Sequence, residues 1–218
     1  MNRLSFARFC RLCAAGLLLT LAGGCGALRP AATSQSSFYS LDSARTAAPV
    51  AAPVAAPASA LTLIINPPHA TAGFDSPRII YVREIHKLEY FSHNEWADTP
   101  ARMLAPLVVA AVENSGTFRA VVLTPSSAAG DLRLDVEIIR LQHEFHTQPS
   151  RVRFTLRAYI VDNTTRRVLA WREFDETVPA ASEDPYGGVV AANRAVQAVL
   201  GNLADFCAEA ARAARMER

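Results

Sequence analysis

The chain has 218 residues, half of them hydrophobic, with 22 basic and 20 acidic side chains and a formal net charge of +2. The first 24 residues hold three arginines and no acid, so the rest of the chain has 19 basic and 20 acidic residues and a net charge of −1. This balance excludes the basic excess that marks nucleic-acid binding. The remaining length suits one domain with a sizeable core.

Residues 1–24 have the layout of a secretory signal peptide. Arg3, Arg8 and Arg11 form a basic front, an apolar run extends from Cys13 to Ala22, and two glycines follow. The apolar run has about ten residues, half of what a bilayer-spanning helix needs. No later stretch is both long enough and free of charge, so we predict no membrane span in the mature protein.

The sequence Leu21-Ala22-Gly23-Gly24-Cys25 resembles a bacterial lipobox, although Ala22 stands where Leu, Val or Ile is usual. In a lipobox the cysteine thiol accepts a diacylglycerol, and the amine exposed by cleavage accepts a further acyl chain such as palmitate. Two or more chains anchor a protein stably where one is marginal. We therefore predict that Cys25 is the lipid attachment site, the alternative being an ordinary signal peptide cleaved nearby.

Residues 25–60 are predicted to be the lipidated N-terminus and a tether. A run of alanine, proline and valine from Ala44 to Ala60 lacks the bulk for a core and favours an extended polyproline form. Its reach is on the order of 50 Å. Ahead of it, the short apolar segment Phe38-Tyr39-Ser40-Leu41 is suited to adding to a sheet edge, and we expect that sheet to be in its own domain rather than in a neighbour.

The predicted domain, residues 61–214, begins with short elements. Residues 61–65 and 78–83 read as strands, and residues 87–96 as a polar and aromatic strand and turn. Thr99 and Pro100 form a good helix start, and residues 114–116 end that helix.

The second half of the domain carries the clearest patterns. Residues 132–138 and 151–160 alternate between apolar and polar side chains, and residues 167–178 return as a third strand, which indicates an antiparallel meander with one wet face. From about Pro185 a long helix has one apolar stripe, formed by Val189, Ala192, Val196, Val199, Leu203, Phe206 and Ala210. The predicted fold class is α+β, with a mixed or mostly antiparallel sheet and two helices packed on one face.

Large apolar residues in irregular surroundings are candidate partner contacts. Each of them has the alternative of folding back into the core. They are Phe38, Tyr39, Leu41, Tyr90, Phe91 and Trp96.

Two other groups of residues have a functional and an ordinary interpretation. His143 and His146 would meet at a metal only if their segment is a turn, and we expect the polar tip of a hairpin instead. Arg151, Arg153 and Arg157 lie on one strand face, where they would either bind an anionic lipid headgroup or pair with acids across the strands, such as Asp135 and Glu137.

The sequence holds no nucleophile elbow, no phosphate-binding glycine loop and no zinc motif. We therefore expect no catalysis, no metal and no cofactor. Cys207 is the remaining cysteine of the mature chain, and we expect it to be a small apolar residue in a helix.

The order and spacing of several segments resemble the ABC-type transport auxiliary lipoprotein family. These segments are Phe38-Tyr39-Ser40-Leu41, Arg78-Ile-Ile-Tyr-Val-Arg83, Leu88-Glu-Tyr90, Trp96-Ala-Asp-Thr-Pro100 with Ala-Arg-Met-Leu104, and Ser115-Gly116 before Phe118-Arg119. The resemblance covers roughly residues 36–212 and is strongest over residues 78–119.

The resemblance implies a non-enzymatic component of the cell envelope. Such proteins accompany an ABC permease and ATPase and a mammalian-cell-entry-type (MCE-type) periplasmic protein, which move lipids or other apolar molecules between membranes. This chain would dock or bridge that complex, with a homo-oligomer as one form it could take. Gly26 follows Cys25 where an Asp would signal retention at the inner membrane, so the outer membrane, facing the periplasm, is the expected location.

Two alternatives remain open at this stage. One is an outer-membrane assembly or scaffold lipoprotein that takes no part in lipid transport. The other is a periplasmic binding module that carries a lipid itself and would need an apolar cavity.

Overall fold

The computed structural model describes residues 35–42 and 60–216. The predicted signal peptide, Cys25 and most of the Ala/Pro/Val run lie outside the described residues. The folded unit starts at Ser36. It therefore includes Phe38 and Leu41, which fall within the range predicted as lipidated N-terminus and tether.

Three long antiparallel strands form the main part of the sheet. Strand β7 (Leu132–Glu144) pairs with β8 (Arg151–Asp162), which pairs with β9 (Val168–Pro179). Their alternating side chains bury one face, as the alternating pattern predicted. The register of β7 against β8 shifts between Ile138 and Arg140, where β7 carries one extra residue. The predicted meander is confirmed.

The other edge of β7 is lined by three short parallel strands, one after another along the chain. They are β2 (Thr62–Ile65), β3 (His69–Ala70) and β4 (Arg78–Val82). Strand β6 (Ala120–Leu123) pairs with β2 on its outer side, also in parallel. Because parallel and antiparallel pairs occur together, the sheet is mixed, as predicted.

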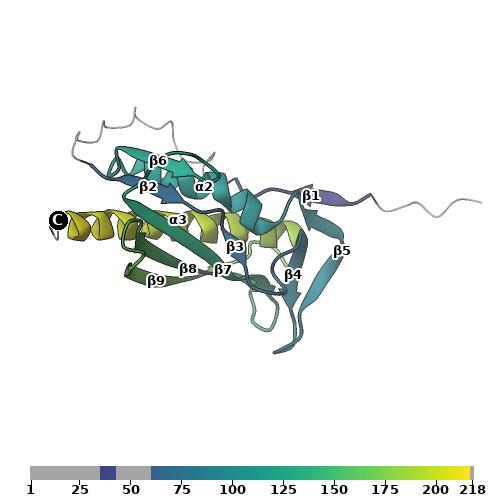
Figure 1. The fold of residues 1–218 in the computed structure, drawn as a ribbon. Coiled ribbons are helices and arrows are strands. Elements are labelled where there is room, and N and C mark those ends of the chain that lie inside the picture. The colour runs from purple at the N-terminus through teal and green to yellow at the C-terminus, as the bar shows by residue number, and fades with distance from the viewer. Residues whose placement is uncertain (1–34, 43–59, 217–218) are drawn as a thin grey trace, which may run out of the picture. The chain divides into compact units, whose positions relative to one another are not determined.

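One end of the sheet is a hairpin extended by a short strand. Strand β5 (Glu89–Trp96) runs antiparallel to β4, and this hairpin projects from the rest of the sheet (Figure 1). Strand β1 (Ser37–Tyr39) pairs with β5 in parallel. The segment before the Ala/Pro/Val run therefore adds to a sheet edge of its own domain, as expected from the sequence.

Two helices pack on this sheet. Helix α3 (Pro185–Met216) lies along β7, β8 and β9, and helix α2 (Pro100–Asn114) contacts α3, β3 and β6 (Figure 1). The predicted α+β class is confirmed. Neither described helix has a stretch that is long and apolar enough to cross a bilayer.

The apolar stripe of α3 faces the core. All seven residues of the predicted stripe are buried, together with Cys207, which lies beside them. Burial in apolar surroundings raises the pKa of the Cys207 thiol to about 12. The core therefore lies between the long strands and α3.

Candidate functional site

The structure places the predicted partner-contact residues at different depths. Phe38 and Tyr90 are exposed, with 65% and 51% of their surface accessible. Tyr39 and Phe91 are half-buried and pack against the core. Phe38 and Tyr90 are therefore the two that a partner can reach directly on the folded domain.

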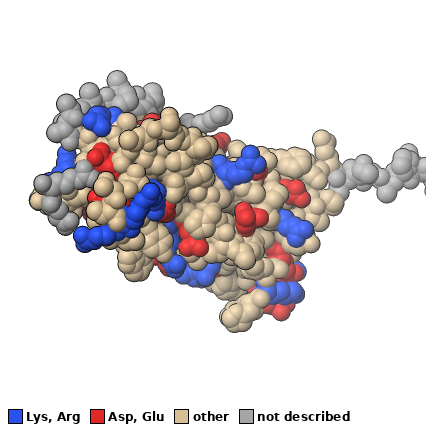
Figure 2. All heavy atoms as spheres, viewed as in Figure 1, with Lys and Arg blue, Asp and Glu red and all other residues tan. Residues whose placement is uncertain are grey.

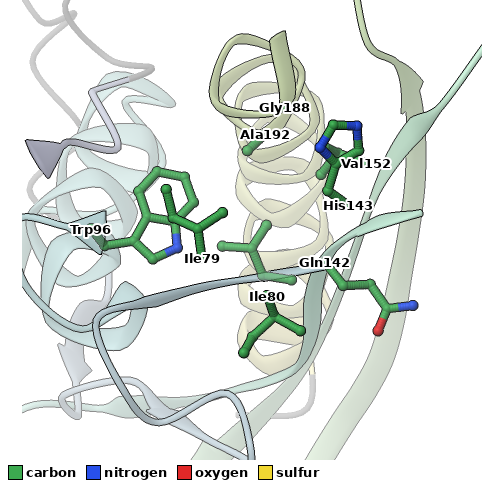
Figure 3. A pocket seen from close by; sticks show the side chains of 9 residues that line it. Ile79, Ile80, Trp96, Gln142, His143, Val152, Gly188 and Ala192 are labelled. Atoms are coloured by element: carbon green, nitrogen blue, oxygen red, sulfur yellow. The ribbon is translucent and has the colours of Figure 1, made fainter. Parts of the chain in front are cut away.

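The remaining two, Leu41 and Trp96, are buried in the core. Trp96 ends β5, and its backbone N–H donates to the carbonyl of Pro77 over 2.7 Å. Its indole lines a small cavity with Ile79 and Ala192 (Figure 3). Leu41 thus anchors the segment that carries Phe38, and Trp96 anchors the strand that carries Tyr90.

Residues Ser36–Asp42, here called the strap, lie across the sheet edge formed by β5. Ser37, Phe38 and Tyr39 stand opposite the last three residues of β5. The carbonyl of Tyr39 accepts a hydrogen bond from the N–H of Ala97 over 2.7 Å, and the Tyr39 hydroxyl donates to Oδ1 of Asn94 over 3.0 Å. Leu41 then enters the core. The strap is thus attached by backbone pairing, one hydroxyl and one buried side chain.

Asn193 of α3 attaches the end of the strap. Its Nδ2 donates to the carbonyl of Ser40 over 3.2 Å, and its Oδ1 accepts from the N–H of Asp42 over 2.8 Å. The same Nδ2 also donates to the carbonyl of Val189, one turn earlier in the helix. One side-chain amide therefore satisfies a backbone donor and a backbone acceptor of the strap. Sequence reasoning did not identify this residue.

A groove of about 580 Å³ runs between the strap and the first half of α3. The rings of Tyr39 and Tyr186 lie 6.4 Å apart along it, and 63% of the Tyr186 surface is exposed. The groove is lined by Phe38, Tyr39, Ser40, Asp42, Tyr186, Val189, Val190, Asn193, Arg194 and Gln197. Phe38 and Tyr186 thus place two exposed aromatic rings at one groove. Tyr186 lies in the first turn of the predicted helix but ahead of its apolar stripe, so the sequence pattern did not single it out.

Residues 83–90, here called the hairpin tip, comprise the turn between β4 and β5 and the first two residues of β5, and they expose apolar side chains among charged ones. Ile85 is 75% exposed and Leu88 is 47% exposed. Arg83 forms a two-pronged hydrogen bond with Glu89, with N–O distances of 2.6 and 3.0 Å. This bond holds the pKa of Glu89 below its ordinary value. The ion pair closes the base of the turn and leaves Ile85 facing solvent.

The hairpin tip is supported from below by aromatic packing. The rings of Tyr81 and Phe91 lie 4.5 Å apart, and each also contacts Phe145 of the β7–β8 turn. The guanidinium of Arg78 stacks 4.2 Å above the ring of Tyr90. The hairpin tip thus carries exposed apolar side chains on a packed base.

His143 lies in the core, and the expectation that it belongs to a polar hairpin tip is wrong. It is 2% exposed and sits within β7, ahead of the turn. Its Nε2 lies 2.8 Å from the Ser150 hydroxyl, and its Nδ1 has no hydrogen-bond partner. Burial lowers the pKa of the ring, against the opposing influence of Glu183 and Asp184. His143 is therefore a core residue whose neutral form is favoured by burial.

The start of α3 fits closely around this histidine. The carboxylate of Asp184 accepts from the N–H of Gly187 over 2.7 Å and caps the helix, while Glu183 accepts from the N–H of Ser150 over 2.8 Å. Gly188 faces the imidazole so closely that a Cβ there would lie 2.5 Å from Nδ1 of His143 (Figure 3). The small pocket between them and β4 is about 10 Å³, which is room for a single water molecule.

The wet face of the three long strands is covered by ion pairs. Arg153 pairs with Asp175, Arg157 with Glu173, and Arg151 with Glu144. The bond from Arg153 holds the pKa of Asp175 below its ordinary value. Because all three arginines are neutralised by acids, the cross-strand interpretation accounts for them without an anionic headgroup.

On the face shown in Figure 2, no large patch carries charge of one sign only. Basic and acidic side chains alternate on the face shown. Within residues 35–42 and 60–216, no three His, Cys, Asp or Glu side chains are grouped as a metal would require. His146 lies 3.7 Å from Glu144.

Comparison with solved structures identifies the fold. A protein of the DUF330 family from Xanthomonas campestris superposes with a TM-score of 0.72 at 24% identity, over 83% of this chain and 99% of the other. A second, uncharacterised protein gives a TM-score of 0.61 at 12% identity, over 79% and 99% of the two chains. These values establish a shared fold.

Sequence comparison gives the family. No curated protein sequence matches this one significantly. The family described as the ABC-type transport auxiliary lipoprotein component matches residues 39–204, a span that runs from the strap to the middle of α3. The match includes the hairpin tip, the ion-paired sheet and the groove residues other than Phe38. This chain therefore belongs to the family of ABC-type transport auxiliary lipoprotein components.

Proposed function

We propose that this protein is a lipid-anchored, non-enzymatic periplasmic component of an MCE-type ABC transport system. Acylated at Cys25, after removal of a signal peptide, it docks or bridges the lipid-transfer complex at the outer membrane. The transport step belongs to its partners, an MCE-type periplasmic protein with its permease and ATPase. Gly26, in place of an Asp after the anchor cysteine, supports the outer over the inner membrane.

The observation that carries the docking role is the contrast between surface and interior. The domain exposes apolar side chains at the groove and at the hairpin tip, as interaction surfaces do. The small pocket beside His143 has room for one water, far less than a lipid needs, and the groove of about 580 Å³ lies at the surface, between the strap and α3. Docking of a carrier is thus better supported than carriage by this domain.

The contact residues proposed here follow their exposure. Phe38, with Tyr186 at the groove, and Tyr90, with Ile85 at the hairpin tip, would insert into the partner. Tyr39 and Phe91 would line the edges of these contacts. Leu41 and Trp96 would act by holding the strap and β5 in place.

Site-specific photo-crosslinking in intact cells tests the docking role. A photoreactive phenylalanine analogue placed at Phe38 or Tyr90 is expected to capture an MCE-type protein, identified by mass spectrometry. Trp171 is the matched control, because it is an aromatic on β9 with a similar exposed fraction, 63%, away from both surfaces. Capture from Trp171 alone would show that the proposed surfaces are wrong. Capture of assembly-machine or cell-wall proteins would replace the transport role with that of a scaffold lipoprotein.

The anchor has its own test. Replacement of Cys25 by alanine is expected to abolish incorporation of labelled palmitate and to move the protein from the membrane to the soluble fraction. Replacement of Cys207 is the control, since this buried thiol should accept no lipid. Incorporation that persists in the Cys25 variant would refute the proposed attachment site.

A further inference from the structure

The strap divides the stretch between Cys25 and the core of the domain into two parts. Residues 26–35 precede the strap, and residues 43–59 follow it and lead to β2. Because the strap is attached to β5 and α3, the chain that leads from Cys25 joins the folded unit at Ser36. The run of alanine, proline and valine then connects two points of the same domain and adds nothing to its reach.

The two arrangements differ strongly in length. Cys25 to Ser36 spans at most about 40 Å when fully extended, since each residue adds about 3.3–3.6 Å. Cys25 to Ala60 spans at most about 120 Å by the same measure. Detachment of the strap therefore increases the maximum reach roughly threefold.

The strap can leave without dismantling the sheet. Strand β1 is an edge strand that pairs with β5 alone among the described strands, over three residue pairs. Its departure leaves β5 paired with β4, and the pairing of β7 with its neighbours is unchanged. Segments with few buried side chains at an edge open at lower free energy than the core. Leu41 is the single strap side chain that is fully buried.

The hydrogen bonds of Asn193 to the strap can be exchanged for hydrogen bonds to water when the strap detaches. Its amide lies near the surface, so water can replace Ser40 and Asp42 when the strap leaves. Its bond to the carbonyl of Val189 lies within α3 and needs no strap. Release thus exposes Leu41 and the core residues that it covers, but it leaves the amide of Asn193 hydrogen-bonded to water and to Val189.

We propose that the strap is a detachable part of the membrane tether, which holds the domain close to the membrane when seated and extends its reach when released. This inference rests on the proposed acylation of Cys25. Residues 43–59 then count toward the maximum reach from Cys25 only when the strap is released. The seated strap also forms one wall of the groove, so release alters the proposed contact surface at the same time.

Two variants of the full-length acylated protein set the limits of reach. Leu41→Asp with Asn193→Ala prevents seating, because it puts a charge into the core and removes the amide. Ser37→Cys with Asn94→Cys, oxidised before labelling, locks the strap, since these residues are opposite each other in the β1–β5 register. A dye on Ala198→Cys, at an exposed position of α3, reports its distance to acceptor lipids in vesicles by energy transfer. Buried Cys207 takes no dye.

The release variant is expected to lie farther from the membrane than the locked variant, with lower energy transfer. The unlocked protein should match the locked one. Equal energy transfer in the release and locked variants would overturn the proposal. So would an unlocked protein that matches the release variant, since its strap would then not be seated.

Hydrogen exchange on the unmodified sequence provides the second measurement. Strap amides are expected to exchange at least tenfold faster than those of β7, with the core still protected. Equal exchange of strap and β7 would show that the strap opens only with global unfolding, which overturns the proposal. This measurement needs neither anchor nor partner, so its result is separate from any failure of the proposed function.

Discussion

Gly188→Ala tests the close fit between the start of α3 and His143. A Cβ at this position would lie 2.5 Å from Nδ1 and 3.0 Å from Cε1 of the imidazole. The ring cannot turn away easily, because its Nε2 is held by the Ser150 hydroxyl and its surroundings are buried. Gly188 is therefore required by the neighbouring side chain, since no positive φ marks this position.

The magnitude follows from two opposing effects. Forcing a methyl group into a packed core costs about 1–3 kcal/mol. Replacing glycine by alanine in a helix recovers about 0.5–1 kcal/mol. We expect Gly188→Ala to lower the free energy of unfolding by up to about 2.5 kcal/mol, which corresponds to a fall in Tm of up to about 10 °C for a domain of this size.

Gly201 provides a matched control in the same helix. A Cβ there would meet no atom within 4 Å. Gly201→Ala should therefore raise the free energy of unfolding by about 0.5–1 kcal/mol. Urea unfolding of both variants, followed by circular dichroism, gives the two signs directly.

The His143→Ala background isolates the contact. Without the imidazole, Gly188→Ala should cost at least about 1 kcal/mol less than it does in the original protein. If Gly188→Ala instead stabilises the protein as Gly201→Ala does, the imidazole does not lie against α3 and the reasoning is refuted.

Three further predictions follow from burial and charge. The pKa of His143 is lower in the folded state than in the unfolded state, so the unfolded state binds a proton first as pH falls. The contribution of neutral His143 to the free energy of unfolding should be fully present above the unfolded-state pKa of about 6.5 and decrease below it. His143→Gln should make the urea midpoint less dependent on pH between 7.5 and 5.5. An unchanged slope in that variant would exclude His143 as the titrating group. The Cys207 thiol, with its pKa raised to about 12, should resist a maleimide at pH 7.5 until urea unfolds the chain, and prompt labelling of the folded protein would contradict its burial. Trp96→Ala should cost about 3–5 kcal/mol, because its indole is buried, while Phe38→Ala at an exposed position should change stability by less than about 0.5 kcal/mol; equal thermal shifts would refute this division.

Periodicity made the long elements predictable from the sequence. The apolar stripe of α3 and the alternation in β7 and β8 are repeated over many residues, and each repeat has one geometric solution. The helix start at Pro100 was predictable for a local reason, since proline fixes the first turn. These features depend on residues that are close together in the chain, so they can be recognised from the sequence.

The position of His143 illustrates what the sequence did not display. Counting alternate residues from Leu132 places His143 on the wet face of β7. The extra residue between Ile138 and Arg140 reverses the alternation, so Leu141 and His143 point inward. No local signal in the sequence marks this bulge. For Trp96 and Leu41 the sequence left two interpretations open, a partner contact and burial in the core, and the fold selects the core.

The attachment of the strap could not be predicted either. Asn193 and Asp42 are separated by 151 positions, and an asparagine on the polar side of a helix is ordinarily solvated. Only the folded chain brings the amide to the strap. The candidate contact surface was thus half predictable: Phe38 and Tyr90 from the sequence, and Tyr186, Ile85 and Asn193 from the structure alone.

The amide of Asn193 has a consequence for self-association. An edge strand presents vacant backbone donors and acceptors that a strand from another molecule can occupy, which is how sheets grow into aggregates. At Ser40 and Asp42 those groups are already bonded to Asn193. One side chain from a helix thus stands where the peptide groups of a foreign strand would bind. Two backbone groups next to β1 are thereby unavailable for edge-to-edge pairing with another molecule.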